Sequence, residues 1–208
     1  LRSSILQEDR TWDFSGLPLH LTSDFRIAAT ATLTIVAGTN IKLPEGVQFE
    51  VDGGLNAVGT LSEPIVFTSE RDDSVGGDTN LDEEDEIAVP GGWDALWIDS
   101  SNVLLEHTTF RYGGNRVNPG NNSWRTSAVH VRGDVAPTLR NVRIEDAENE
   151  GLFIGGGQPI LEGVHVERVG REPFFVESSA DPIYVDISAR ENVFNRVTLR
   201  GSQINSDR

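Results

Sequence analysis

The chain has 208 residues, 33 of them acidic and 17 basic, for a formal net charge of −16. This charge argues against nucleic acid or an anionic membrane surface as the partner, because both repel a strongly acidic protein. The absence of cysteine excludes disulfides and thiol chemistry. No apolar run approaches the about 18 residues of a spanning helix, so we expect no membrane insertion.

From the N-terminus onward the sequence predicts short strands with a recurring step, and nowhere an amphipathic helix. In the first third, Leu33 and Ile35 map onto Leu55 and Ala57 with a step of 22 residues. A constant step of this size is typical of solenoid proteins, in which each repeat is one structural unit that stacks on the next.

The same step continues through the middle of the chain. Residues 139–144 recur as residues 161–166, and looser copies lie at 105–110 and 194–199. A second column of apolar segments follows a similar step, with members at 95–98, 128–131, 151–154 and 173–176. Each repeat therefore predicts two or three strands joined by bends at Gly, Asn or Asp.

These repeats predict an all-β fold, a right-handed parallel β-helix of about seven coils that forms a single domain over residues 1–208. The handedness follows from the strong preference of parallel crossover connections. Two coils are longer than the others because they carry inserted loops at 70–92 and 113–125. An antiparallel sandwich is the alternative, but it predicts turns every 8–12 residues without a constant step.

The two ends of the chain resemble each other. Residues 1–10 and 199–208 share Leu, Arg, Ser, Asp and Arg at equivalent places. Chance similarity between polar segments is one interpretation, and a unit cut from a longer tandem array is the other. Neither end offers a polar cap, so we expect head-to-tail continuation, either into neighbouring repeats of the same chain or into copies of itself.

Several short motifs between Ile5 and Tyr112 are of one type: Asp9-Arg-Thr-Trp12, Ala31-Thr-Leu-Thr-Ile-Val-Ala-Gly-Thr39, Leu55-Asn-Ala-Val-Gly-Thr60, Pro64-Ile-Val-Phe-Thr-Ser69, Asp72-Asp73, Gly77-Asp-Thr-Asn80, Gly91-Gly-Trp93 and Phe110-Arg-Tyr-Gly-Gly114. With them, this half of the chain resembles the extracellular right-handed β-helix proteins of bacterial and archaeal surfaces. The resemblance implies that architecture and a cell-surface location. It implies little about activity, because the fold hosts lyases, hydrolases, adhesins and stalks alike.

The first insertion is strongly acidic, with nine carboxylates between Glu70 and Glu86. Such a cluster must be solvated, protonated or neutralised by a cation, and oxygen ligands at alternate positions suit Ca²⁺. The similar surface proteins carry Gly where this chain has Glu83, which puts the tight turn in doubt. The alternative is a disordered, solubilising loop. The predicted calcium ligands are Asp72, Asp73, Asp78, Asn80, Asp82 and Glu84.

Strand alternation in the second column places one ring of each segment on the outer face, about 4.8 Å from the next. We therefore expect an exposed ladder of Trp97, His130, Phe153 and Phe175. Exposed apolar surface usually contacts something. The contact would be a sugar ring, a neighbouring subunit, or an inserted loop folded over the ladder, with Trp124 as the candidate cover.

The sequence offers little support for catalysis. Asp94, Asp99 and Asp134 do not share one register. His107, His130 and His165 occupy different places in their coils, and no Ser stands as their partner in a recognisable nucleophile motif. We therefore expect a non-catalytic extracellular structural or adhesive module, calcium-stabilised, that continues end to end as a stalk or filament. The alternative is a carbohydrate-binding or polysaccharide-degrading module that uses the aromatic ladder.

Overall fold

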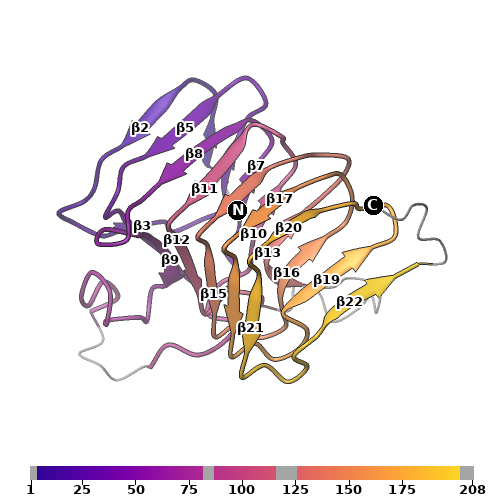
Figure 1. The fold of residues 1–208 in the computed structure, drawn as a ribbon. Coiled ribbons are helices and arrows are strands. Elements are labelled where there is room, and N and C mark those ends of the chain that lie inside the picture. The colour runs from indigo at the N-terminus through magenta and orange to yellow at the C-terminus, as the bar shows by residue number, and fades with distance from the viewer. Residues whose placement is uncertain (1–3, 82–86, 116–125, 202–208) are drawn as a thin grey trace.

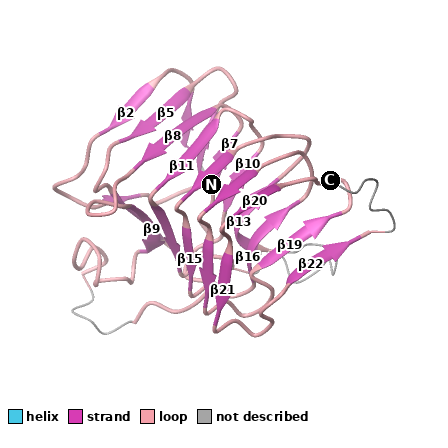
Figure 2. Cartoon of the chain, viewed as in Figure 1, coloured by secondary structure: helices cyan, strands magenta, loops and turns pink. Residues whose placement is uncertain are grey.

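The computed structural model describes residues 4–81, 87–115 and 126–201. Every regular element within these residues is a β-strand (Figure 2), so the expected all-β class is confirmed. None of the described residues forms a helix that could span a membrane.

The strands form three parallel sheets, which we call A, B and C. Sheet A contains β1 (Ser4–Leu6), β4 (Phe25–Ile27), β7 (Phe49–Val51), β10 (Leu96–Ile98), β13 (Ser127–Val131), β16 (Glu150–Ile154), β19 (Phe174–Glu177) and β22 (Val197–Arg200). Sheet B contains β2 (Arg10–Trp12), β5 (Thr32–Ile35), β8 (Gly54–Val58), β11 (Val103–Glu106), β14 (Thr138–Arg140), β17 (Ile160–Glu162) and β20 (Ile183–Val185). Sheet C contains β3 (Leu19–His20), β6 (Asn40–Leu43), β9 (Ile65–Ser69), β12 (Thr108–Arg111), β15 (Arg143–Glu145), β18 (His165–Glu167) and β21 (Ser188–Arg190).

The chain visits the sheets in the fixed order A, B, C, and we call each such round a coil. Successive coils stack from the indigo end to the yellow end in Figure 1, and the described residues form seven coils plus one further strand of sheet A. This order and the parallel pairing are consistent with a parallel β-helix, and they exclude the antiparallel sandwich for these residues.

The strand register follows the repeat seen in the sequence. Leu105, Leu139 and Leu161 lie in one row across sheet B. The segment 194–199, however, is not the next copy, because Leu161 pairs with Tyr184. The expectation for 194–199 was wrong because the strand in this segment, β22, belongs to sheet A, whose apolar alternation looks the same in the sequence.

One hydrophobic core runs through the stack, built from the inward side chains of all three sheets. Alternate residues of each strand point inward, so every coil adds a layer of apolar side chains to the same interior. Five aromatic rings stack along the first half of this interior, with neighbouring ring centres 4.8 to 5.5 Å apart: Trp12, Phe25, Phe49, Phe67 and Phe110.

Sharp corners between the sheets use left-handed backbone. Between sheets B and C, His107, Asn141 and Asp186 have φ of 45°, 51° and 53°. Asn and Asp tolerate this conformation better than other side chains, which explains why the sequence places them at the bends.

Both insertions leave the stack at the same corner, between sheet C and sheet A. The first follows β9 and the second follows β12. Their bases touch, since Gly114 N–H donates to the Asp94 carbonyl at 2.7 Å and Asn115 N–H to the Trp93 carbonyl at 3.2 Å. The two insertions therefore emerge from one side of the molecule, as expected of a solenoid.

The similarity between residues 1–10 and 199–208 does not follow the strand rows. Pairing from coil to coil along sheet A places Ser4 level with Val197. The sequence match would align Ser4 with the residue at 202 instead. The match is five residues out of the structural register, so it does not describe equivalent positions in the fold.

Candidate functional site

The first insertion folds back over the outer face of sheet C, where it meets a row of basic side chains. His20, Lys42 and Arg111 lie in one outward row that also includes Thr68. His20 Nε2 lies 2.8 Å from Glu70 Oε2 at the start of the insertion. The acidic segment thus has cations of the protein itself beneath it.

Lys42 is the only lysine of the chain, and its side chain is 0% exposed. Its ammonium group donates a hydrogen bond to the Gly77 carbonyl and lies 3.9 Å from Asp73 Oδ1. Burial lowers the pKa of Lys42, while Asp73, Asp72 and Asp78 act in the opposite direction. A buried ammonium therefore ties the insertion to sheet C.

Asp72 is held by three groups of the protein. Its Oδ2 accepts a hydrogen bond from Thr68 Oγ1 at 2.6 Å and lies 3.1 Å from Arg111 Nη1. Its Oδ1 accepts a hydrogen bond from Ser74. Both oxygens are thus engaged and the charge is balanced by Arg111, so Asp72 does not fit the role of a calcium ligand in this arrangement.

The other predicted ligands are spread along the insertion. Asp78 Oδ1 accepts a hydrogen bond from the Leu81 N–H at 2.6 Å, which closes a local turn. Asn80 is half-buried, and Asp82 and Glu84 lie outside the described residues. Within the described part of the chain, no group of three or more His, Asp or Glu side chains is arranged to hold a metal ion.

The aromatic ladder exists as a stack on the outward side of sheet A. Pairing places Trp97, His130, Phe153 and Phe175 in one row. Neighbouring ring centres are 4.4, 4.1 and 5.5 Å apart, and Arg132 lies over the Trp97 ring at 4.6 Å. The ring faces are therefore occupied by one another and by a guanidinium group.

The expectation that the ladder is exposed was wrong. Trp97, His130, Phe153 and Phe175 are only 7%, 8%, 8% and 1% exposed. Alternation along a strand indicates which face a side chain takes, but not whether the chain folds back over that face. The chain itself provides the cover, which favours the intramolecular alternative, and Trp124 lies outside the described residues.

Burial also determines the chemistry of the ladder. It lowers the pKa of His130 to about 3, and Arg132 acts in the same direction. The imidazole is therefore neutral at physiological pH. Such a group packs as a ring and does not serve as a pH-sensitive acid or base.

Beside the ladder, buried carboxylates lie at or just before the first residues of strands in sheet A. Glu150 and Glu172 lie within 4 Å of Arg171, and Glu172 also lies 3.2 Å from Arg196. Asp94 is 4% exposed, and its Oδ1 has no hydrogen-bond partner among the described residues. Burial raises the pKa of Asp94 to about 6, with smaller contributions from Asp24 and Glu45.

Glu167 on sheet C gathers the densest ion-pair network. Its carboxylate accepts hydrogen bonds from Arg190, Arg168 and Arg143, and His165 Nε2 lies 3.1 Å away. The hydrogen bond from Arg190 is the main reason that the pKa of Glu167 lies well below its usual range. Sequence reasoning missed this residue because its partners come from three different coils.

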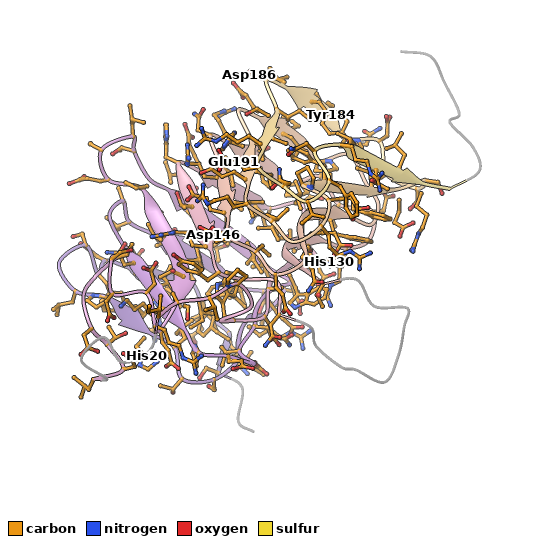
Figure 3. All side chains as sticks on the ribbon, turned by 90° about the horizontal axis from the view of Figure 1, so that it is seen from below. His20, His130, Asp146, Tyr184, Asp186 and Glu191 are labelled. Atoms are coloured by element: carbon orange, nitrogen blue, oxygen red, sulfur yellow. The ribbon has the colours of Figure 1, made fainter. Side chains whose placement is uncertain are left out.

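The histidines of the described residues lie in different settings. His107 lies at a corner and His130 in the ladder. His165 lies between a hydroxyl and a carboxylate, with its Nδ1 2.8 Å from Ser188 Oγ and its Nε2 3.1 Å from Glu167 Oε2. Figure 3 shows His20 and His130 on separate parts of the molecule. Asp99 is paired with Arg132, with 2.9 Å between Oδ1 and Nε.

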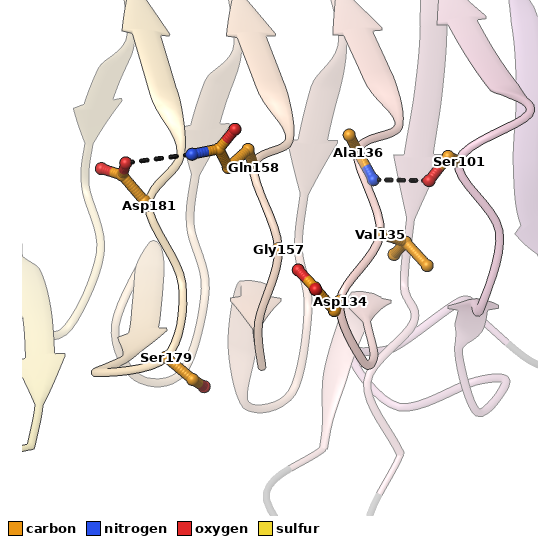
Figure 4. Close-up of a pocket in the computed structure, with 8 residues that line it drawn as sticks. All are labelled: Ser101, Asp134, Val135, Ala136, Gly157, Gln158, Ser179 and Asp181. Atoms are coloured by element: carbon orange, nitrogen blue, oxygen red, sulfur yellow. Dashed lines mark hydrogen bonds between the residues drawn. The ribbon is translucent and has the colours of Figure 1, made fainter.

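A shallow groove of about 400 Å³ lies at the corner between sheets A and B (Figure 4). It is lined mainly by small and polar residues, including Asp134, Gly157 and Asp181. Gln158 Nε2 donates to Asp181 Oδ2 at 3.2 Å, so one of the two carboxylates in the groove is already bonded within the lining. No aromatic ring lines it, which makes it a poor surface for stacking a sugar.

The C-terminal end of the described stack, from β20 to β22, presents the largest concentration of exposed apolar side chains. They include seven of the fourteen exposed large hydrophobic residues of the described chain: Ile183, Tyr184, Val185, Val193, Phe194, Val197 and Leu199. Figure 3 shows Tyr184 beside the final yellow strands. This end of the stack is the surface whose composition departs most from an ordinary solvated surface.

Scans against protein-family models, curated proteins and solved structures found no match to this chain.

Proposed function

We propose that the chain is a non-catalytic structural or adhesive module of the extracellular or cell-surface space, built as a closed right-handed parallel β-helix. Its interior would continue beyond the last coil, either into a following repeat of the same chain or into another copy. The right hand follows from the preference of parallel crossovers. The resemblance of the first half to surface β-helix proteins supports the location.

One observation carries this proposal. Val176 and Leu199 occupy the same inward row of sheet A in successive coils. Val176 is 1% exposed and Leu199 is 61% exposed. The two side chains have equivalent places in the fold, and among the described residues β22 covers only the first. The apolar row of sheet A thus ends on an exposed side chain, and the repeats of a solenoid are stabilised mainly by their neighbours.

The ion pairs support a structural role as well. Three arginines near the C-terminal end of the described stack each pair with a glutamate one turn earlier in the stack: Arg190 with Glu167, Arg196 with Glu172 and Arg200 with Glu177. These charged side chains stabilise the stack by pairing with one another. Because they are paired, they are not free to act on a substrate.

Calcium binding by the first insertion stays a prediction. Arg111 and Lys42 already supply positive charge near Asp72 and Asp73, so the calcium prediction depends on its other ligands, Asp78, Asn80, Asp82 and Glu84.

The test compares assembly with carbohydrate chemistry. Purified chain should form concentration-dependent rods in electron microscopy, or be found as a contiguous rod in a longer parent protein. It should neither deplete acidic or neutral polysaccharides from solution nor shorten them. Specific binding on a glycan array, or release of new reducing ends, would replace this proposal with the carbohydrate-active alternative.

A further inference from the structure

A hydroxyl, an imidazole and a carboxylate lie in series on the outward face of sheet C. His165 Nδ1 lies 2.8 Å from Ser188 Oγ, and His165 Nε2 lies 3.1 Å from Glu167 Oε2. Ser188 and His165 occupy one row on the paired strands β21 and β18, and Glu167 follows His165 by two residues on β18. Strand alternation therefore places all three side chains on the same face.

The charge of Glu167 determines which nitrogen of the imidazole carries the proton. Hydrogen bonds, the one from Arg190 above all, hold the pKa of Glu167 well below its usual range, although burial acts in the opposite direction. An ionised carboxylate can only accept hydrogen bonds, so Nε2 of the neutral imidazole must be the donor. Nδ1 then presents its lone pair to Ser188 and accepts the hydrogen bond from the hydroxyl group.

Solvent exposure increases along the series toward the hydroxyl group. The Glu167 side chain is 3% exposed and the His165 side chain 20%, whereas Ser188 is exposed. The buried carboxylate thus orients the imidazole, and the hydroxyl group meets solvent. A serine that hydrogen-bonds to an imidazole, whose other nitrogen is held by a carboxylate, has the arrangement that activates the hydroxyl group as a nucleophile.

The sequence did not reveal this arrangement because Ser188 comes one coil after His165. The two residues meet only when β21 pairs with β18. Other described histidines have different partners: His20 Nε2 lies beside Glu70, and His130 Nδ1 is buried without a hydrogen-bond partner. The series of hydroxyl, imidazole and carboxylate therefore sets His165 apart from both of them.

A groove of about 270 Å³ ends at the same imidazole. Leu61 and Pro64 form part of its wall, and Arg143 lies in the row beside His165. None of the residues that line the groove is acidic. Its volume lies below the roughly 300 Å³ at which pockets for drug-sized molecules begin, so we expect a short acyl group to lie there.

We propose that Ser188 is a nucleophilic serine that accepts an acyl group from an activated carboxylic ester or thioester, with His165 as the general base and Glu167 as the residue that positions it. Ser188 Oγ forms a bond to the carbonyl carbon while its proton passes to His165 Nδ1. The bond between this carbon and the leaving oxygen or sulfur then breaks, and His165 returns the proton to the leaving group. The products are an ester on Ser188 and a free alcohol or thiol.

The charge balance around Glu167 favours one transfer per chain over turnover. Glu167 accepts hydrogen bonds from Arg143, Arg168 and Arg190. Its charge is therefore largely neutralised, and it stabilises an imidazolium less than a lone carboxylate would. Release of the acyl group needs His165 to take a second proton, from water, and is slow for this reason. The modification goes beyond the structural role proposed above and does not depend on it.

4-Nitrophenyl acetate tests the proposal on the purified chain, because released 4-nitrophenolate counts the transfers and peptide masses locate the acetyl group. We expect release of about one equivalent and acetylation of Ser188. Competing reactions should be few, since the chain has no cysteine and its single lysine, Lys42, is buried. Ser188→Ala should abolish the release, and His165→Gln should slow it by on the order of 100-fold.

Ser62→Ala is the matched control. Ser62 is also exposed, but its hydroxyl group lies 3.3 Å from that of Thr60 instead of an imidazole, so the variant should react like the wild type. His165→Asn provides a second test if His165→Gln lowers the melting temperature. The positioning role of Glu167 has its own readout, since nitrogen NMR should find the His165 proton on Nε2 in the wild type and on both nitrogens in Glu167→Gln.

Two results overturn the proposal and leave the structural function standing: acetylation of Ser188 no faster than that of Ser62, or an unchanged rate in His165→Gln. Continued release of 4-nitrophenolate beyond one equivalent, if Ser188→Ala abolishes it, would instead overturn the non-catalytic function while Ser188 remains the nucleophile. Failure of this proposal and failure of the proposed function are thus separate outcomes of one experiment.

Discussion

Asp94 is the residue whose ionisation should limit stability at neutral pH. Its carboxyl group is buried without a partner for Oδ1, and its pKa rises from 3.8 to about 6. The folded state therefore binds the proton more tightly than the unfolded state does. Stability contributed by the neutral form is present at low pH and declines as pH rises from about 4 to about 6.

Asp94→Asn should consequently raise the free energy of unfolding at pH 7, by on the order of 2 kcal/mol. The gain should disappear below about pH 4, where the wild-type side chain is protonated in both states. Thermal unfolding across this range measures both effects. Asp134→Asn is the control, because Asp134 is exposed and should change little. A loss of stability at pH 7 would show that the Asp94 carboxylate makes a favourable contact.

Glu167 should behave in the opposite way. Its pKa is lowered chiefly by the hydrogen bond from Arg190, so the stability it contributes is present above the ordinary glutamate pKa and is lost as pH falls below it. Glu167→Gln should lower the free energy of unfolding by about 2 kcal/mol at pH 7. The deficit should shrink in acid, as chemical denaturation at pH 7 and pH 3 would reveal.

Glu162→Gln is the comparison for this experiment. Glu162 pairs with Arg140 at 2.8 Å, but its side chain is exposed, so the substitution should cost less than about 0.5 kcal/mol. Equal effects of the two substitutions would mean that burial of the Glu167 network adds nothing.

At the scale of single elements, two glycines of neighbouring turns separate backbone strain from contact between coils. Gly133 and Gly157 have φ of 71° and 73°. A Cβ atom on Gly133 would meet nothing within 4 Å, whereas one on Gly157 would lie 1.9 Å from the Val135 carbonyl oxygen of the preceding coil. The same substitution thus probes two different costs.

Gly133→Ala should destabilise the fold by about 1 kcal/mol, the cost of a left-handed non-glycine residue. Gly157→Ala should cost on the order of 3 kcal/mol more, because the neighbouring coil must move. Urea denaturation of both variants gives the difference. Similar free energies of unfolding for the two variants would indicate that the neighbouring coil moves aside from the added methyl group at little cost.

The first insertion is the element to which the calcium prediction belongs. Millimolar Ca²⁺ should raise the melting temperature relative to a chelator and should protect the insertion from proteolysis. Identical melting and cleavage patterns under both conditions would contradict the prediction. In that case the buried ammonium of Lys42 and the guanidinium of Arg111 would be the insertion's own counter-ions.

The positions of the strands could be predicted where the repeat step in the sequence was constant. The solvent exposure of the outward side chains could not. Leu105, Leu139 and Leu161 share a row because each coil must return an apolar side chain to the same interior. The burial of His130 could not be predicted, because strand alternation gives only the face that a side chain takes and not its exposure. The partners of Glu167 could not be predicted either, because they come together only when three coils are stacked.

For the molecule as a whole, stability should decrease from the central coils toward β22. Central coils are covered on both sides, whereas β22 pairs with only one neighbour in the described chain. In a stack of this kind each coil is stabilised mainly by its neighbours, so the last one opens most readily. Amide hydrogen exchange should be fastest in Val197–Arg200 and slowest around β13 and β16. Uniform protection along the chain would contradict this gradient.

The fold class of the whole molecule could be predicted from the repeat alone, but the relation between its ends could not. The similarity between the two terminal decapeptides suggested a tandem period, yet the strand rows place Ser4 level with Val197. Short polar segments match easily by composition, whereas register is set by which side chains must reach the interior.

The single lysine has a practical consequence for anyone who handles this protein. Amine-reactive dyes, cross-linkers and surface-immobilisation chemistries depend on ε-amino groups, and the one that this chain possesses is sealed between sheet C and the first insertion. Acylation of Lys42 would therefore report the moments at which that insertion lifts away. The rate of local opening could therefore be measured in a routine labelling reaction, from the mass of the peptide that contains Lys42.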